Sequence, residues 1–153
     1  MKKIIKSLPV GVLSAIVVLG ITYFSLAPRP LGDISMRLFP HSDKVAHFLM
    51  YFVAVIAFLT DYAKAIKPHH TKLNIELALL ASAMLLGLIL EIIQLAMNIG
   101  RGYDTMDIFA DCIGALAGFG YMKWKGLHAV RRTLLSSSHH HRHKHRHHRK
   151  STD

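Results

Sequence analysis

The sequence predicts an all-α fold, an integral membrane four-helix bundle followed by a disordered C-terminal tail rich in His, Arg and Lys. Three observations support this prediction: four apolar runs follow one another, Lys and Arg gather at their ends, and the tail is almost wholly polar. Hydrophobic residues make up 52% of the chain, and because the tail contributes little, the remainder is more apolar still. We therefore expect a membrane domain over residues 1–135 and a tail over residues 136–153.

Each apolar run is read as a helix that crosses a bilayer. A transmembrane helix needs about 20 mostly apolar residues, because each residue rises about 1.5 Å across a hydrocarbon core of about 30 Å. Lipid offers no hydrogen-bond partner to the backbone, so such runs must be helical. The expected spans are Leu8–Ala27, Val45–Tyr62, Ile75–Met97 and a short, glycine-rich Ile108–Trp124.

The first run also resembles a signal peptide. Lys2, Lys3 and Lys6 precede it, and Ser25–Ala27 resembles a cleavage site. The apolar stretch, however, exceeds the usual core of about 7–15 residues. Pro28 would also stand directly after the cut, where signal peptidases tolerate it poorly. We therefore expect an uncleaved first span.

Lys and Arg in the short loops predict the orientation, because cytoplasmic loops carry an excess of both. The cations at the C-terminal end of the fourth span decide the prediction, since the contrast between the earlier loops is small. Both termini are expected in the cytoplasm. The cations on that side are Lys2, Lys3, Lys6, Lys64, Lys67, Lys72, Lys123, Lys125, Arg131 and Arg132, against Arg29, Arg37, Lys44 and Arg101 opposite.

Polar side chains within the last three spans fall on single helical faces, at spacings of three and four residues. With this orientation each polar face lies in the outer half of its span. The polar side chains of the three spans are therefore expected at the same depth in the membrane. The residues are Lys44, His47 and Tyr51, then Glu91, Gln94 and Asn98, and finally Asp107, Asp111, Gly114 and Gly118. The candidate substrate-binding set is Asp43, Lys44, His47, Tyr51, Glu91, Gln94, Arg101, Asp107 and Asp111.

The chemistry of this set leaves two interpretations open. Ionisable groups within spans usually face protein or water and mark functional sites. Glu91 must find a cation or take a proton, and Lys44 and Arg101 are its available partners. Glu91, Asp107 and His47 are the candidate acid–base residues, although no nucleophile–base–orienter arrangement is evident. The alternative is structural: interhelical hydrogen bonds that average well under about 2 kcal/mol each.

Side chains of types that can bind metal ions occur in both the membrane domain and the tail. Carboxylates beside His47 suit a divalent ion, but the sequence shows no compact ligand motif, so we expect no cofactor and no metal in the membrane domain. The tail is either a solvated basic segment near anionic lipid or a transition-metal buffer that uses neutral imidazoles. Its candidate ligands are His139, His140, His141, His143, His145, His147 and His148.

Three motifs together resemble the VanZ-like family of cell-envelope proteins. They are Asp43-Lys44-x-x-His47-x-x-x-Tyr51, then Glu91-x-x-Gln94, and then Arg101 followed by Asp107-x-x-x-Asp111-x-x-Gly114-x-x-x-Gly118. Their order and spacing, more than any one motif, make the match specific. The family pattern more commonly has Asn at the position of Asp111, so the site chemistry does not transfer without change.

The resemblance implies a multi-pass protein, expected in the cytoplasmic (inner) membrane of a prokaryote. The family's namesake is associated with low-level resistance to teicoplanin, which does not make resistance the role of this chain. The leading hypothesis is an outer-facing polar pocket that binds or processes a lipid-linked or cell-wall component, with Lys44 and Arg101 binding an anionic group. A structural accessory subunit and a small proton-linked transporter remain alternatives. Membrane lipids are expected partners and nucleic acid is not, because the cations lie at span ends and in the tail.

Overall fold

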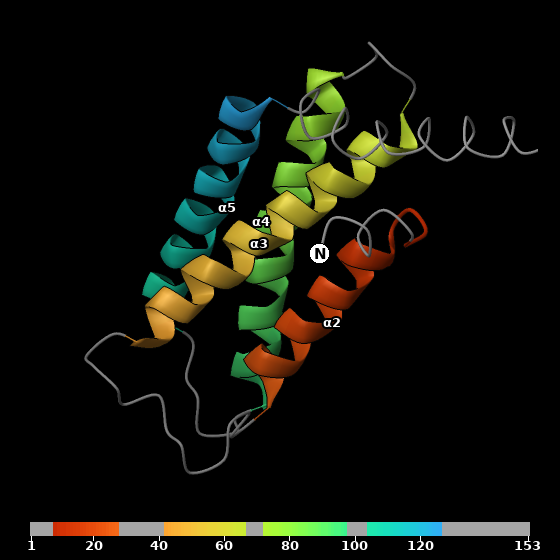
Figure 1. The fold of residues 1–153 in the computed structure, drawn as a ribbon. Helices are drawn as coiled ribbons and strands as arrows, with labels where there is room; N and C mark the ends of the chain where they lie inside the picture. The colour runs from red at the N-terminus through yellow and green to blue at the C-terminus, as the bar shows by residue number, and fades with distance from the viewer. Residues whose placement is uncertain (1–7, 28–41, 67–71, 98–103, 127–153) are drawn as a thin grey trace, which may run out of the picture.

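The computed structural model describes residues 8–27, 42–66, 72–97 and 104–126, and every element within these ranges is an α-helix (Figure 1). The helices are α2 (Val12–Leu26), α3 (Ser42–Ala65), α4 (Leu73–Met97) and α5 (Thr105–Lys125). They form a bundle in which α5 packs chiefly on α3, while α2 contacts both α3 and α4. The all-α four-helix prediction is confirmed.

The helix lengths refine the expected spans. The helices α3 and α4, with 24 and 25 residues, are long and apolar enough to cross a membrane by length and composition. In contrast, α2 is a shorter apolar helix of 15 residues. It begins at Val12, after a Gly11 whose φ of 88° is left-handed, so the expected start at Leu8 was wrong. Finally, α5 has 21 residues and carries ionisable side chains near both ends.

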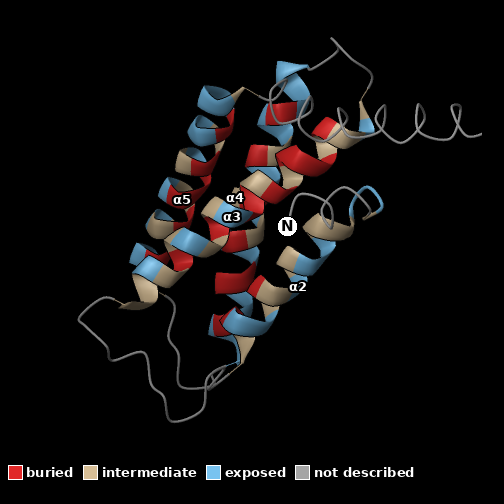
Figure 2. Cartoon of the chain, viewed as in Figure 1, coloured by how far each residue is buried: buried red, intermediate tan, exposed pale blue. Residues whose placement is uncertain are grey.

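The bundle has a buried apolar core, but it also buries several polar residues and exposes many large apolar side chains; Figure 2 shows the burial along each helix. Large apolar side chains on all four helices are exposed, for example Leu19, Leu49, Leu85 and Phe109. Water-soluble proteins rarely expose apolar surface on this scale, whereas lipid covers it at no cost. Among the described residues, the buried polar side chains are those of Ser25, His47, Thr60, Asp61, Glu76, Glu91, Gln94, Asp107 and Asp111.

The packing of α3 on α5 depends on two glycines. A Cβ atom at Gly118 would lie 2.6 Å from the carbonyl oxygen of Phe52, and one at Gly114 would overlap the carbonyl oxygen of Phe48. The backbone of α5 therefore lies directly against that of α3, as expected of a small-xxx-small pattern. This close approach brings the N-terminal halves of α3 and α5 together, where the polar residues lie.

Buried carboxylates at the opposite end of the bundle all have partners. Asp61 of α3 accepts hydrogen bonds from the backbone N–H (2.9 Å) and hydroxyl (2.8 Å) of Ser14, in the first turn of α2. Lys64 lies 3.1 Å from the same carboxyl group. Across the bundle, Glu76 of α4 is paired with Lys123 of α5. Each buried acid here thus has a cation beside it.

Candidate functional site

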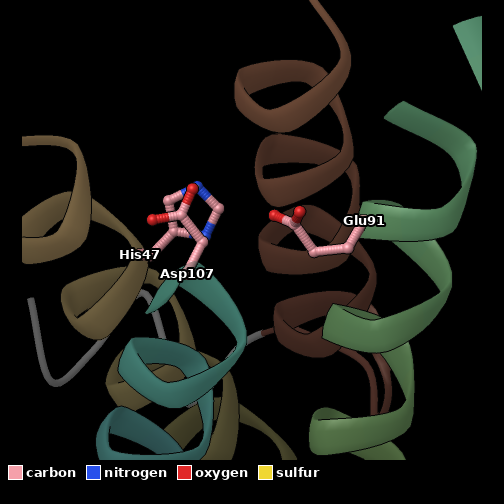
Figure 3. A group of neighbouring side chains, drawn as sticks. All are labelled: His47, Glu91 and Asp107. Atoms are coloured by element: carbon pink, nitrogen blue, oxygen red, sulfur yellow. The ribbon is translucent and has the colours of Figure 1, made fainter. Parts of the chain in front are cut away.

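Three helices bring His47, Glu91 and Asp107 together at the end of the bundle where α3 and α5 begin and α4 ends. One ligand-type atom from each side chain lies within 4.8 Å of the other two. All three residues are buried, with exposed fractions of 4%, 1% and 9%. Figure 3 shows the Glu91 carboxyl group pointing from α4 toward His47 and Asp107. We call these three residues the polar cluster.

Lys44 lies at the rim of the polar cluster and contacts three carboxylates. Its Nζ atom donates hydrogen bonds to Asp104 (2.5 Å) and Asp107 (2.8 Å) and lies 3.7 Å from Asp43. The hydrogen bond from Lys44 lowers the pKa of the Asp104 carboxyl group below its usual value. The sequence suggested Lys44 as a partner for Glu91, but the structure pairs it with the acids that begin α5.

His47 is held in one orientation by Asp111, which lies one helical turn beyond Asp107. The Nδ1 atom of His47 lies 2.9 Å from Oδ1 of Asp111. A carboxylate only accepts hydrogen bonds, so Nδ1 is assigned as the donor. In a neutral imidazole Nε2 then carries the lone pair, and this atom lies 4.0 Å from Oδ2 of Asp107.

Glu91 is the least satisfied acid of the polar cluster. Its side chain accepts one hydrogen bond from the described residues, a long one of 3.5 Å from the backbone N–H of Asp104. No Lys or Arg nitrogen in the described ranges lies within 4.0 Å of its carboxyl oxygens. Arg101, its other expected partner, lies outside these ranges, as do the tail histidines.

Tyr51 and Gln94 have different positions relative to the polar cluster. Tyr51 is 1% exposed, and its ring lies beside Asp111 at Gly87, where an added Cβ would be 3.2 Å from the ring and 2.7 Å from Oδ2 of Asp111. Gln94 instead donates a 2.6 Å hydrogen bond to the carbonyl oxygen of Ser25. Gln94 therefore anchors the end of α2, and its predicted binding role receives no support from this contact.

Two residues of this region were missed in the sequence. Asp104 accepts a 2.8 Å hydrogen bond from the backbone N–H of Met106 and so caps the N-terminus of α5. An Asp directly before a helix is a recognisable capping signal, so this residue could have been found. Gly87 offered no such signal, because only the packing of α5 and Tyr51 against it shows why it must be small.

Acidic groups outnumber basic ones around the polar cluster. Among the described residues, one ammonium group and one imidazole face five carboxyl groups, those of Asp43, Glu91, Asp104, Asp107 and Asp111. The Oδ2 atom of Asp111 is buried and has no hydrogen-bond partner in this part of the chain. Because carboxyl groups are in excess here, this region is expected to bind a cation more readily than an anion.

Comparison with known proteins yields one match. The family model described as VanZ/LLP1 matches residues 8–126, which include all four helices. No curated protein and no solved structure matches the chain.

Proposed function

Because this chain belongs to the VanZ/LLP1 family, we propose that its polar cluster binds or processes a lipid-linked or cell-wall component. The chain is a cell-envelope membrane protein, in keeping with its two apolar helices of spanning length. The finer proposal is a multi-pass protein of a prokaryotic cytoplasmic membrane, with both termini in the cytoplasm and the polar cluster toward the outside. The observation that carries it is the convergence of buried His47, Glu91 and Asp107 from three helices.

The two ends of the bundle differ in a way that supports a binding role. At one end Asp61 and Glu76 are each beside a lysine, as expected of interactions that only hold helices together. At the other end Glu91 has a single long hydrogen bond from the described residues. A buried charge without a close partner is costly. A ligand that completes its coordination would explain why such a group is kept there.

Lys44 takes a different role from the one expected from the sequence. Its ammonium group already contacts Asp104 and Asp107, so it orders these acids and has little capacity left for an anionic ligand. Arg101 stays the candidate side chain for an anionic group, since it precedes Asp104 by only three residues. A guanidinium group suits phosphate because it donates two parallel hydrogen bonds.

Photocrosslinking to a polyprenyl phosphate tests this proposal. The full-length protein in lipid nanodiscs is expected to label with a photoreactive polyprenyl phosphate and much less with the matching polyprenol. Glu91→Gln is expected to weaken labelling by about tenfold or more, equivalent to about 1.4 kcal/mol of binding, because a phosphate can enter this acidic region only together with a cation that the Glu91 carboxylate binds. Glu76→Gln is the matched control, since it changes a buried glutamate of the same helix at the opposite end.

Each result of this experiment has a defined meaning. Equal labelling of wild type, Glu91→Gln and Glu76→Gln would show that the polar cluster is not the binding site. Absence of phosphate-dependent labelling in the wild type would remove the lipid-phosphate ligand. A Glu91→Gln variant of low abundance, with normal labelling per folded molecule, would assign the cluster a structural role.

Cysteine labelling in intact cells tests the orientation. In a Cys112→Ala background, Gly102→Cys is expected to react with a membrane-impermeant maleimide, and Ser137→Cys only after the cells are permeabilised. The reason is the distribution of Lys and Arg, which predicts that the segment after α4 lies outside and the tail inside. The reverse pattern would place the polar cluster toward the cytoplasm, and a cell-wall ligand would lose its physical basis.

A further inference from the structure

The atoms of the polar cluster are spaced like ligands that surround a common point. The Nε2 atom of His47 and Oδ2 of Asp107 lie 4.0 Å apart. One ligand-type atom from each of His47, Glu91 and Asp107 lies within 4.8 Å of the other two. A transition metal binds nitrogen and oxygen at about 2.0–2.2 Å, so neighbouring ligands lie about 3 to 3.5 Å apart. Ion binding therefore requires these atoms to move closer together, through rotation of the Glu91 and Asp107 side chains.

Two neighbouring residues hold these groups as metal ligands are usually held. Asp111 accepts the Nδ1 hydrogen bond of His47 at 2.9 Å, which leaves Nε2 directed at the polar cluster. A carboxylate behind a histidine is the common outer partner of a metal-bound imidazole. Lys44 binds Oδ1 of Asp107 at 2.8 Å and so leaves Oδ2 on the side of His47. Asp111 and Lys44 thus orient His47 and Asp107 toward each other before any ion binds.

The environment of Glu91 independently indicates that a cation binds here. This side chain is 1% exposed and aimed into the polar cluster, and no described Lys or Arg nitrogen lies within 4.0 Å of it. The Oδ2 atom of Asp111 is also buried and has no hydrogen-bond partner among the described residues, and the region holds five carboxyl groups and one ammonium group within the described ranges. A divalent cation offsets this excess negative charge, which an anionic ligand alone would increase.

We propose that His47, Glu91 and Asp107 bind a divalent transition metal ion, with Mn²⁺ and Zn²⁺ as the candidates. One imidazole and two carboxylates suit these ions, because imidazole selects against Mg²⁺ and Ca²⁺, and thiolate ligands are absent from the set. Three protein ligands leave coordination positions for an oxygen of a phosphate-bearing ligand. This last clause rests on the proposed function, whereas the metal site rests on the geometry alone.

A metal site within the bundle differs from the sequence-based expectation of no metal in the membrane domain. The ligands lie on three different helices, so their spacing along the chain forms no compact motif. The expected charge compensation of Glu91 by Lys44 is also not what the structure shows, since Lys44 contacts Asp104 and Asp107.

Binding of Mn²⁺ alone tests the metal site. Full-length protein, purified in detergent and treated with a chelator, is titrated with Mn²⁺, and free Mn²⁺ is followed by electron paramagnetic resonance. The wild type and Glu76→Gln are expected to bind one more Mn²⁺ per chain than His47→Gln, Glu91→Gln and Asp107→Asn. The histidine-rich tail is the same in every variant, so its contribution cancels in the comparison. Equal stoichiometry in all five proteins would overturn the proposal.

A second measurement uses only proteins in which the polar cluster is unchanged. It stays informative even where a variant of the cluster fails to fold. Mn²⁺ is expected to raise the thermal unfolding midpoint of the wild type and of Glu76→Gln, because an ion bound by three helices stabilises their association. An unchanged midpoint at saturating Mn²⁺ would overturn the proposal. Both measurements are made without lipid ligand, so metal binding without polyprenyl phosphate labelling would reject the proposed ligand and leave the metal site in place.

Discussion

Replacing Gly114 with alanine is expected to destabilise the protein by about 3 kcal/mol, near the upper end of the usual cost of overpacking. The new Cβ atom would overlap the carbonyl oxygen of Phe48 and lie 2.9 Å from its carbonyl carbon. These are backbone atoms of α3, so no side-chain rotation can relieve the overlap. The helices α3 and α5 must separate, which also draws His47 away from Asp107.

The matched control lies on the same helix. Gly120→Ala places its Cβ where no other atom lies within 4 Å. It is expected to be neutral or to stabilise by about 0.5–1 kcal/mol, because glycine costs more backbone entropy than alanine in a helix. Unfolding by sodium dodecyl sulfate in mixed micelles, followed by circular dichroism, compares the two variants. Equal effects at both positions would contradict the close packing of α3 on α5.

The second large effect is expected from His47→Phe, which removes the partner of Asp111. The Asp111 side chain is 2% exposed and already has one oxygen without a hydrogen bond in the described residues. Loss of the imidazole leaves the other oxygen unpaired too, at a cost of about 3–5 kcal/mol. Asp111→Asn is expected to cost much less, because its carbonyl oxygen can still accept the hydrogen bond from Nδ1.

A double-mutant cycle measures the coupling energy between His47 and Asp111 and separates it from the other effects of each substitution. The double variant His47→Phe/Asp111→Leu is expected to be more stable than His47→Phe alone, since an apolar pair leaves no buried charge. The same detergent unfolding assay, run with a chelator present, measures all four corners of the cycle. Stability losses that simply add would show that His47 and Asp111 are not coupled.

The sequence predicted the helices well because apolar length and helical periodicity are local properties. The shared face of His47 with Tyr51 and that of Asp107 with Asp111 follow directly from the 3.6-residue repeat, and the structure buries all four side chains. The start of α2 was predicted less well. Hydropathy does not register Gly11, whose left-handed backbone precedes the first residue of α2 and so sets where the helix begins.

The sequence could not predict which side chains of different helices contact each other. Lys44 reaches Asp104 and Asp107, not Glu91, because the pairing depends on how α3 crosses α5. The contact of Asp61 with Ser14 joins residues 47 positions apart and has no local signature. The orientation, the uncleaved first span and the role of the tail stay predictions, and the tail lies outside the described residues.

The order of the helices along the chain has a consequence for biogenesis. The polar face of α3 carries Lys44 and His47, yet their partners Asp104, Asp107 and Asp111 arrive with α5, after all of α4 has been synthesised. If α3 entered lipid before α5 is made, His47 would lack the carboxylate that it contacts in the folded bundle, which is unfavourable. We therefore expect α3 to be released into lipid only together with α5.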